Sequence, residues 1–183
     1  YGLPKARVRI IDDLMYRHWN TWSDYSYSHI FTGRFNGSKI TDIMDIMDGQ
    51  RFESPLSPDF DQKEIAWSPD GKFLAYTIKR LRGKDYARST NSDIILHELA
   101  TGREINITDE NKGYDRYPVF SPDGSMIAWQ SMQSDGYESD LGRLFVYSLK
   151  NGSSKWITEK WDFDAENITW ADNSTIFFTS AHL

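Results

Sequence analysis

The stretch Trp67-Ser68-Pro69-Asp70-Gly71 returns later in the chain as Phe120-Ser121-Pro122-Asp123-Gly124. Each copy leads into an apolar run that ends in alanine and an aromatic residue, Phe73-Leu74-Ala75-Tyr76 and Met126-Ile127-Ala128-Trp129. An altered third copy begins at Trp170, and the aspartates Asp70, Asp123 and Asp172 are 53 and then 49 residues apart. A period near fifty with a turn at a fixed place predicts repeated β units, which we interpret as propeller blades.

The Ser-Pro-Asp-Gly element has the chemistry of a tight hairpin turn. Proline presets φ for the first central position, and Gly71 and Gly124 accept the positive φ of a type I turn with a bulge. At the third site, Asp172-Asn173 is expected to do the same, since asparagine tolerates left-handed backbone. The recurrence argues against catalysis by these aspartates, because a catalytic acid is needed once and a turn residue once per blade.

The second half of the unit repeats as well. A strand over 94–99, a turn at Thr101-Gly102 and a strand over 104–108 are matched by 144–149, Asn151-Gly152 and 155–158. The unit is therefore predicted to be four antiparallel strands with two tight turns. The middle connections, 80–92 and 133–142, are polar and are expected to be exposed loops.

The predicted fold class is all-β: a partial propeller of four-stranded antiparallel blades, with two complete blades and two half blades. We expect residues 1–183 to form a single propeller fragment. Its predicted parts are a leading segment, a half blade, two blades and a final half blade, over 1–28, 29–44, 63–108, 117–158 and 165–183 respectively. An acidic connection, 45–61, follows the first half blade.

Three blade-equivalents are too few for an ordinary closed propeller, which has about 4–8 blades. An open end exposes unpaired strand edges that invite pairing with another chain. Two interpretations stay open: a fragment whose other blades are missing, with edges that can pair, or a homodimer that closes head-to-tail into a six-bladed ring.

Composition narrows the class of protein. The 183 residues include 7 Trp, 10 Tyr and 10 Phe, which favours half-buried β surfaces. The net charge of -6 argues against a nucleic-acid partner, which needs a basic surface. There are no cysteines, hence no disulfide or thiolate metal site. No apolar run is long enough for a membrane span, and the N-terminus lacks the features of a signal peptide.

The candidate site residues favour structural roles. The histidines, His18, His29, His97 and His182, lack metal-ligand spacing, and packing in strands is expected for His29 and His97. Asp42, Asp45 and Asp48 lack the pattern of a calcium loop, and we interpret them as a solvated loop. Asp162, Asp164 and Glu166 suit turns and caps. We therefore predict no catalytic, cofactor-binding or metal-binding residues and no cofactor.

The sequence also contains one basic cluster and one aromatic cluster. The basic residues Lys79, Arg80, Arg82, Lys84 and Arg88, around Tyr86, are interpreted as a solvated loop rather than a site for acidic peptide or nucleic acid. For the aromatic residues Trp19, Trp22, Tyr25 and Tyr27, packing across a blade interface and contact with a catalytic domain stay open.

The repeats resemble the WD40-like repeats of TolB and of the propellers in the prolyl oligopeptidase family of serine peptidases. Three ordered segments over 14–183 resemble the bacterial dipeptidyl and acylaminoacyl peptidases of that family more closely. They are Leu14–Trp22, Gly136–Asp140 with Arg143–Tyr147, and Ile157–Asp162 with the Trp170 turn.

This resemblance implies a non-catalytic, N-terminal propeller that gates substrate access in a serine exopeptidase releasing dipeptides. It implies as partners a C-terminal α/β-hydrolase domain and peptide substrates, and a periplasmic or secreted parent. The chain departs from the whole enzyme: its only Gly-x-Ser, Gly152-Ser153-Ser154, falls in a predicted hairpin instead of a Gly-x-Ser-x-Gly elbow. Glu138 is a single acid, without the Glu-Glu pair with which some members bind a substrate N-terminus.

The alternative function is that of TolB, a propeller that acts as a protein-binding module and does no chemistry. The coding sequence beyond Leu183 separates the two: a Gly-x-Ser-x-Gly motif there supports the peptidase, and a stop after a few more blades supports the binding module.

Overall fold

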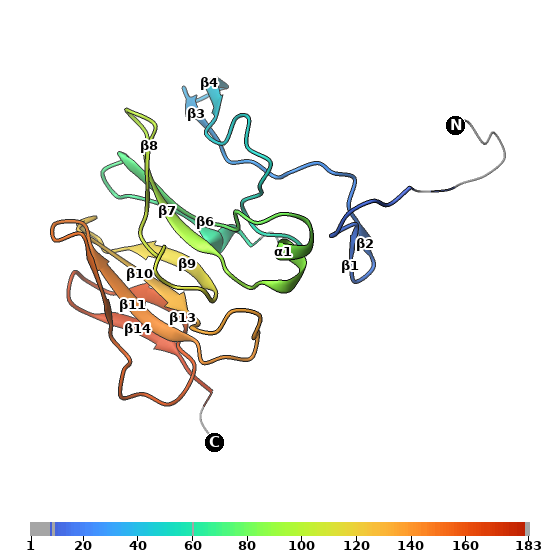
Figure 1. Ribbon diagram of the computed structural model, residues 1–183. Coiled ribbons are helices and arrows are strands. Elements are labelled where there is room, and N and C mark those ends of the chain that lie inside the picture. The colour runs from blue at the N-terminus through green and yellow to red at the C-terminus, as the bar shows by residue number, and fades with distance from the viewer. Residues whose placement is uncertain (1–7, 9, 60, 182–183) are drawn as a thin grey trace.

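The computed structural model describes residues 8, 10–59 and 61–181. Within them the chain is almost entirely β-structure, in two four-stranded and three two-stranded sheets, all antiparallel. The predicted all-β fold class, with two complete blades and two half blades, is confirmed (Figure 1).

Each four-stranded sheet is a simple meander. The first blade contains β5 (Ile65–Trp67), β6 (Phe73–Ile78), β7 (Asp93–Glu98) and β8 (Arg103–Asn106). The second blade contains β9 (Asp115–Phe120), β10 (Met126–Ser131), β11 (Arg143–Ser148) and β12 (Ser153–Trp156).

Three hairpins complete the fold. The leading hairpin pairs β3 (Phe31–Phe35) with β4 (Ile40–Asp45), and the final hairpin pairs β13 (Glu166–Trp170) with β14 (Ile176–Thr179). A short third hairpin, β1 (Arg17–His18) with β2 (Thr21–Trp22), lies in the segment before β3 and was not predicted.

The two Ser-Pro-Asp-Gly turns have the predicted geometry. Gly71 and Gly124 have φ values of +70° and +72°, in the left-handed region where glycine is favoured. In both turns the serine hydroxyl donates to the aspartate Oδ1, at 2.8 Å from Ser68 and 2.7 Å from Ser121. Both serines are buried in their blades, so these hydrogen bonds attach the exposed turn to the blade core.

The third turn differs from the prediction. Asn173 is not in the left-handed region. Trp170 pairs directly with Ile176, whereas Trp67 pairs with Leu74, so this turn is one residue shorter and needs no positive φ. Asp172 still organises it, because its Oδ1 accepts from the Ser174 and Thr175 amides at 2.7 and 2.8 Å.

The blades stack face to face, and the core lies between them. One cluster joins Ala75, Ile94 and Leu96 of the first blade to Ile127 and Trp129 of the second. A separate cluster packs the final hairpin on the second blade. Fully burying one large apolar side chain contributes about 1.5–3 kcal/mol, so these contacts hold the stack together.

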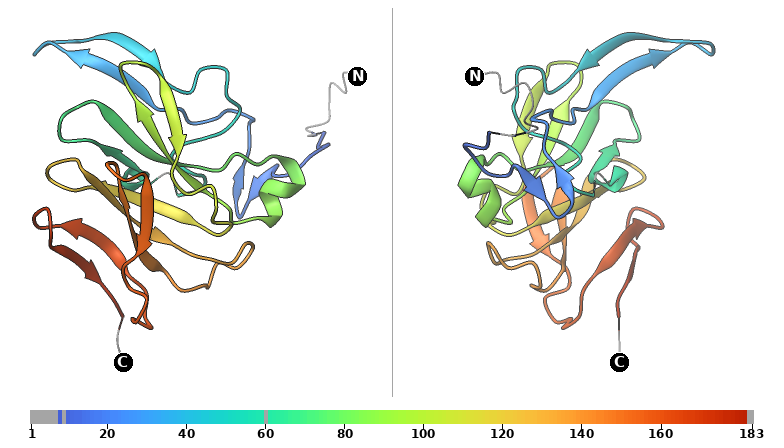
Figure 2. Two further views of the ribbon diagram at one scale, coloured as in Figure 1. Left: turned by 60° about the vertical axis from the view of Figure 1, so that its left-hand side comes forward. Right: turned by 90° about the vertical axis from the view of Figure 1, so that its right-hand side faces the viewer.

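An antiparallel meander places its connections alternately at two ends of the strands. We call the end with the tight turns, 68–72, 99–102, 121–125 and 149–152, the turn face. The opposite end, the connector face, carries the second-to-third-strand loops and the blade-to-blade segments. Both the short helix α1 (Gly83–Arg88) and the β1–β2 hairpin lie at the connector face (Figures 1 and 2).

The expectation of a simple exposed loop over 80–92 was wrong in part. Residues 83–88 of this connection form α1, and a 3-10 helix, η1 (Gln62–Glu64), precedes β5. Lys79 explains the order of the loop, because it lies beneath α1 and binds its backbone. The division of the chain into parts stays a prediction.

Candidate functional site

The connector face carries a cluster of charged groups and tyrosines that the linear sequence does not bring together. Lys79 is almost fully buried, and its Nζ donates to the carbonyl oxygens of Tyr86 and Ser89, at 2.8 and 2.5 Å. Burial lowers the pKa of Lys79 to about 8, although Asp135, Glu138 and Glu53 favour its charge. Lys79 thus fixes α1 against the first blade.

Glu53 contacts α1 through Tyr86, and its charge interacts with that of Lys79. Its Oε1 accepts from the Tyr86 hydroxyl at 3.0 Å and from the Ser57 amide at 3.2 Å. Burial raises the pKa of Glu53, and burial together with this carboxylate raises the pKa of Tyr86. Glu53 and Tyr86 therefore form a partly buried, hydrogen-bonded carboxylate–phenol pair at the connector face.

A buried ion pair joins the first blade to the second. Glu64 is completely buried, and its carboxylate accepts from Arg116 Nε at 2.7 Å and from the Leu56 amide at 2.6 Å. Burial raises the pKa of Glu64, against the opposing effect of Arg116. The arginine also lies over the ring of Tyr117, 4.7 Å from its centroid. This pair fixes the position of the segment before β5.

The loops of neighbouring blades bind each other directly. Asp135, in the loop before β11, accepts from the Ser89 hydroxyl at 2.6 Å and from the Thr90 amide at 2.9 Å. The Gly136 amide donates to the Thr90 hydroxyl at 3.0 Å. Hydrogen bonds therefore join the second-to-third-strand loops of the two complete blades at the connector face.

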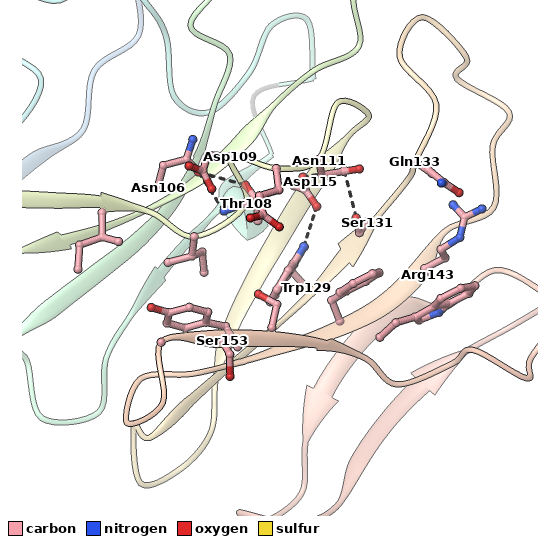
Figure 3. Close-up of a pocket in the computed structure, with 18 residues that line it drawn as sticks. Asn106, Thr108, Asp109, Asn111, Asp115, Trp129, Ser131, Gln133, Arg143 and Ser153 are labelled. Atoms are coloured by element: carbon pink, nitrogen blue, oxygen red, sulfur yellow. Dashed lines mark hydrogen bonds between the residues drawn. The ribbon is translucent and has the colours of Figure 1, made fainter.

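A groove of about 720 Å³ separates the outer part of the two complete blades (Figure 3). Asp115 lies at its base, where Oδ1 accepts from Trp129 Nε1 at 2.7 Å and Oδ2 from Asn111 Nδ2 at 2.9 Å. Burial raises the pKa of Asp115 to about 6. Each carboxylate oxygen thus has a protein partner, and Asp115 joins the blade-linking segment to β10.

The described histidines are separate from one another and from any metal-binding group. His29 precedes β3, and its Nδ1 lies 2.7 Å from Asp45 Oδ2. His97 is buried in β7, 3.5 Å from Glu104, and His18 lies in β1 beside Trp19. His182 lies outside the described residues. Over 10–59 and 61–181, no group of three acidic or histidine side chains could hold a metal ion.

The interpretation of Asp42, Asp45 and Asp48 as a solvated loop was wrong for Asp42 and Asp45, which lie in β4, whereas Asp48 lies in the turn that follows. The second acidic run, Asp162, Asp164 and Glu166, lies just before β13 and at its start. Asp45 accepts from the Met47 amide at 2.8 Å, whereas Asp42 and Asp48 are exposed. Asp164 Oδ1 accepts from the Gly142 amide at 2.7 Å, Asp162 is exposed and Glu166 begins β13. Gly152-Ser153-Ser154 lies in the β11–β12 hairpin, where Gly152 has a φ of +63°.

The interpretation of the basic cluster as a solvated loop was wrong for one of its members, Lys79. Lys79 is buried, Arg80 is 2.6 Å from Glu104, and Arg82 lies over Phe52 at 4.8 Å. Arg80, Arg82, Lys84 and Arg88 are exposed, as was expected of all five. Lys79, Arg80 and Arg82 therefore have contacts at the connector face, although the two arginines are also exposed to solvent.

The aromatic stretch is not packed between the described blades, and both interpretations of it stay predictions. Trp19, Tyr25 and Tyr27 are 79%, 57% and 43% exposed, and Trp22 is 46% exposed. Together with α1, the segment lines a cavity of about 430 Å³ that includes Glu53, Lys79 and Tyr86. The aromatic stretch therefore belongs to the connector face.

The sequence analysis missed Glu53, Glu64, Arg116 and Asp115. Glu64 lies just before the first strand of the first blade, and Asp115 begins the first strand of the second blade. A charged residue beside a strand that is expected to be buried is a signal that could have identified both.

Known relatives cover nearly the whole chain. It is 45% identical over 177 residues to dipeptidyl-peptidase 5 of Porphyromonas gingivalis. The aligned region covers 96% of this chain and 26% of that protein. Dipeptidyl-peptidase 5 of Porphyromonas endodontalis is 45% identical over 79% of this chain and 21% of that protein. That of Aspergillus fumigatus is 32% identical, over 98% of this chain and 28% of that protein.

The comparisons with family models and with solved structures gave no family match and weaker similarities. No protein-family model matches the chain. A putative TolB from Agrobacterium tumefaciens is 23% identical with a TM-score of 0.44, over 63% of this chain and 37% of that structure. TolB from Acinetobacter baumannii is 24% identical with a TM-score of 0.37, over 56% of this chain and 23% of that structure.

The described residues contain no helix that is long and apolar enough to cross a membrane. The chain spans about a quarter of the length of the curated relatives it matches. With its four-stranded sheets and its identity to these relatives, this chain is a β-propeller segment homologous to the dipeptidyl-peptidase 5 proteins.

Proposed function

We propose that this chain is a non-catalytic propeller segment of a serine exopeptidase that releases dipeptides, and that it gates access of peptides to a catalytic domain elsewhere in the protein. The observation that carries this proposal is the 45% identity to a dipeptidyl-peptidase 5 over 96% of the chain. A periplasmic or secreted location of the whole protein belongs to the same proposal.

The architecture of the connector face supports a gating role. Its loops come from two blades; Asp135 accepts hydrogen bonds that join them, and Lys79 donates to the backbone of one of them. A surface that admits some peptides and excludes others must hold its shape, because a loose loop lets larger chains pass. The side chains on this surface are carboxylates and tyrosines, which suit contact with a peptide backbone and its amino terminus.

Within the described residues, no hydrogen bond joins a serine to a histidine, and the one Gly-x-Ser lies in a tight hairpin. Nucleophilic catalysis by serine needs an adjacent base held by a third group. This supports the assignment of the chemistry to another part of the protein.

The test uses the full-length protein with Lys79→Met, which removes both bonds to the α1 backbone. We expect unchanged kcat/KM on a dipeptidyl chromogenic substrate and a rise in the relative rate on peptides of ten or more residues. Lys84→Met, an exposed change on the same helix, is the control. The chain alone is expected to hydrolyse neither substrate.

Two results would contradict the proposal. Serine-dependent turnover by the purified chain would place catalysis within it. An equal fall of activity on short and long peptides in Lys79→Met would mean that Lys79 supports the structure without any role in selecting peptide length.

A further inference from the structure

The groove between the two complete blades does not depend on strands that the leading and final hairpins lack. One wall is formed by β11 and β12 of the second blade, and the other by β8 of the first blade with the segment 107–111 that follows it. Further blades would extend the stack at its two ends and would leave both walls of this groove in place.

Aromatic side chains form much of the second-blade wall. Phe145 and Trp156 are a cross-strand pair whose rings are stacked, with centroids 6.2 Å apart and an interplanar angle of 7°. Trp129 continues the row at 5.6 Å from Phe145. The paired positions of the first blade hold Ile95 and Asn106 instead, so the blade fold does not require aromatic residues here. Because Phe145 and Trp156 line the groove and are only half-buried, part of their ring surface is open to a ligand.

The connector-face end of the groove is acidic. Asp109 and Glu110 are exposed there, on the segment after β8, and Asp115 lies at the base. Among the described residues that line the groove, Arg143 is the one cation, and Figure 3 shows it across the groove from Asp109. Its guanidinium is already paired with Asp140 at 3.4 Å. This end of the groove therefore favours a positively charged group on a ligand.

The size of the groove suits a short extended peptide. Alternate residues of β11 over 143–147 line it, and four residue steps of a strand span about 13 Å. Its volume of about 720 Å³ lies in the range of ligand sites, roughly 300–1,000 Å³. The turn-face end, 152–154, contributes a glycine and two serines and no charge. Charge at one end and aromatic rings along the wall would thus give a bound peptide one direction.

We propose that this groove binds an extended segment of a polypeptide. An aromatic or large aliphatic side chain of the segment packs on Phe145 and Trp156, and a lysine or arginine side chain lies near Asp109 and Glu110. The apolar contact supplies most of the affinity, because an ion pair at an exposed rim adds little. The charges set the direction of the peptide and exclude acidic segments. This binding does not depend on the gating role proposed for the connector face.

A positional-scanning library of acetylated hexapeptide amides tests the proposal on the full-length protein. The acetyl group removes the free amino terminus, so an exopeptidase that releases dipeptides does not cleave these peptides. Fluorescence anisotropy of labelled peptides measures binding. We expect affinity in the micromolar range, with a preference for an aromatic or large aliphatic residue at one position and for lysine or arginine a few positions away.

Two variants assign the binding to this groove. Trp156→Ser should weaken binding of the preferred peptide on the order of tenfold. The double variant Asp109→Asn with Glu110→Gln should remove the preference for a basic residue, and with it the weakening of binding by added salt. Both carboxylates are exposed, so the double variant keeps the fold even if Trp156→Ser lowers stability.

Matched controls lie on the segment after β12, outside the groove: Trp161→Ser, and Glu159→Gln with Asp162→Asn. They should change neither the affinity nor the preference. No binding, a preference for acidic peptides, or equal effects of the groove variants and the controls would each overturn the proposal. A dimer mass by light scattering that Trp156→Ser abolishes would mean that a second copy occupies the groove, and it would overturn the proposal as well.

Discussion

The buried carboxylate of Asp115 is expected to make the stability of the chain depend on pH. It is 1% exposed, and its oxygens accept from Trp129 and Asn111 at the base of the groove between blades. Burial raises its pKa from 3.8 to about 6, so the folded protein holds this proton more tightly than the unfolded chain does. Its contribution to stability is fully present below pH 4 and is lost as the pH rises through 6.

Asp115→Asn should remove this dependence on pH. We expect the variant to gain free energy of unfolding relative to the wild type between pH 4 and pH 7, by on the order of 1–3 kcal/mol. Urea denaturation at pH 4, 5, 6 and 7 measures the difference. Asp123→Asn, at an exposed turn, should show no such rise. A constant difference between Asp115→Asn and wild type across these pH values would show that Asp115 ionises normally.

At the scale of the element, the hairpin turns depend on their glycines. Gly71 and Gly124 have positive φ, and a Cβ added at either would lie 3.4 Å from a neighbour, Trp67 Nε1 or Pro69 Cδ. Space is therefore sufficient, and the constraint is the backbone conformation, which a β-branched residue tolerates badly.

Gly71→Val and Gly124→Val should each lower the free energy of unfolding by about 1–3 kcal/mol through this strain. Thermal and urea denaturation measure the change. Lys72→Val, next to the turn and without positive φ, is the control. If both glycine variants melt at the wild-type temperature, the turn assignment is wrong.

At the scale of the whole molecule, polar contacts between blades add to the apolar core. Glu64 precedes the first strand of one blade, and Arg116 lies in the first strand of the next. Because Glu64 is completely buried, removing its partner leaves a carboxylate without compensation. Removal of one member of a buried pair typically costs 3–5 kcal/mol.

Arg116→Met should therefore destabilise the chain by about 3 kcal/mol at pH 7. The double variant Glu64→Gln with Arg116→Met should recover most of this loss, because the buried charge is then absent. Arg103→Met, at an exposed position of β8, is the control. A loss no larger in Arg116→Met than in Arg103→Met would mean that the pair does not join the blades.

Much of the architecture was predictable because it depends on local chemistry. Ser68–Gly71 and Ser121–Gly124 contain the residues that their turn requires, and the repeat placed the flanking strands. The third turn was predicted incorrectly, since the loss of one residue changes its geometry and asparagine alone does not reveal it. The β1–β2 hairpin was missed because two-residue strands have no periodicity to detect.

By itself, the sequence determined the β class, the four-stranded unit and the structural role of Asp70 and Asp123, since backbone sterics and side-chain alternation act over a few residues. Only the tertiary structure decided that Lys79 lies beneath α1, that Glu64 meets Arg116 and that Asp115 is buried. Glu64 and Arg116 are 52 residues apart in the chain. The burial of Lys79 and Asp115 depends on the elements that pack around them, and the energy of a buried charge depends on what surrounds it in space. The groove between the two complete blades belongs to the same class, because its walls come from two separate sheets.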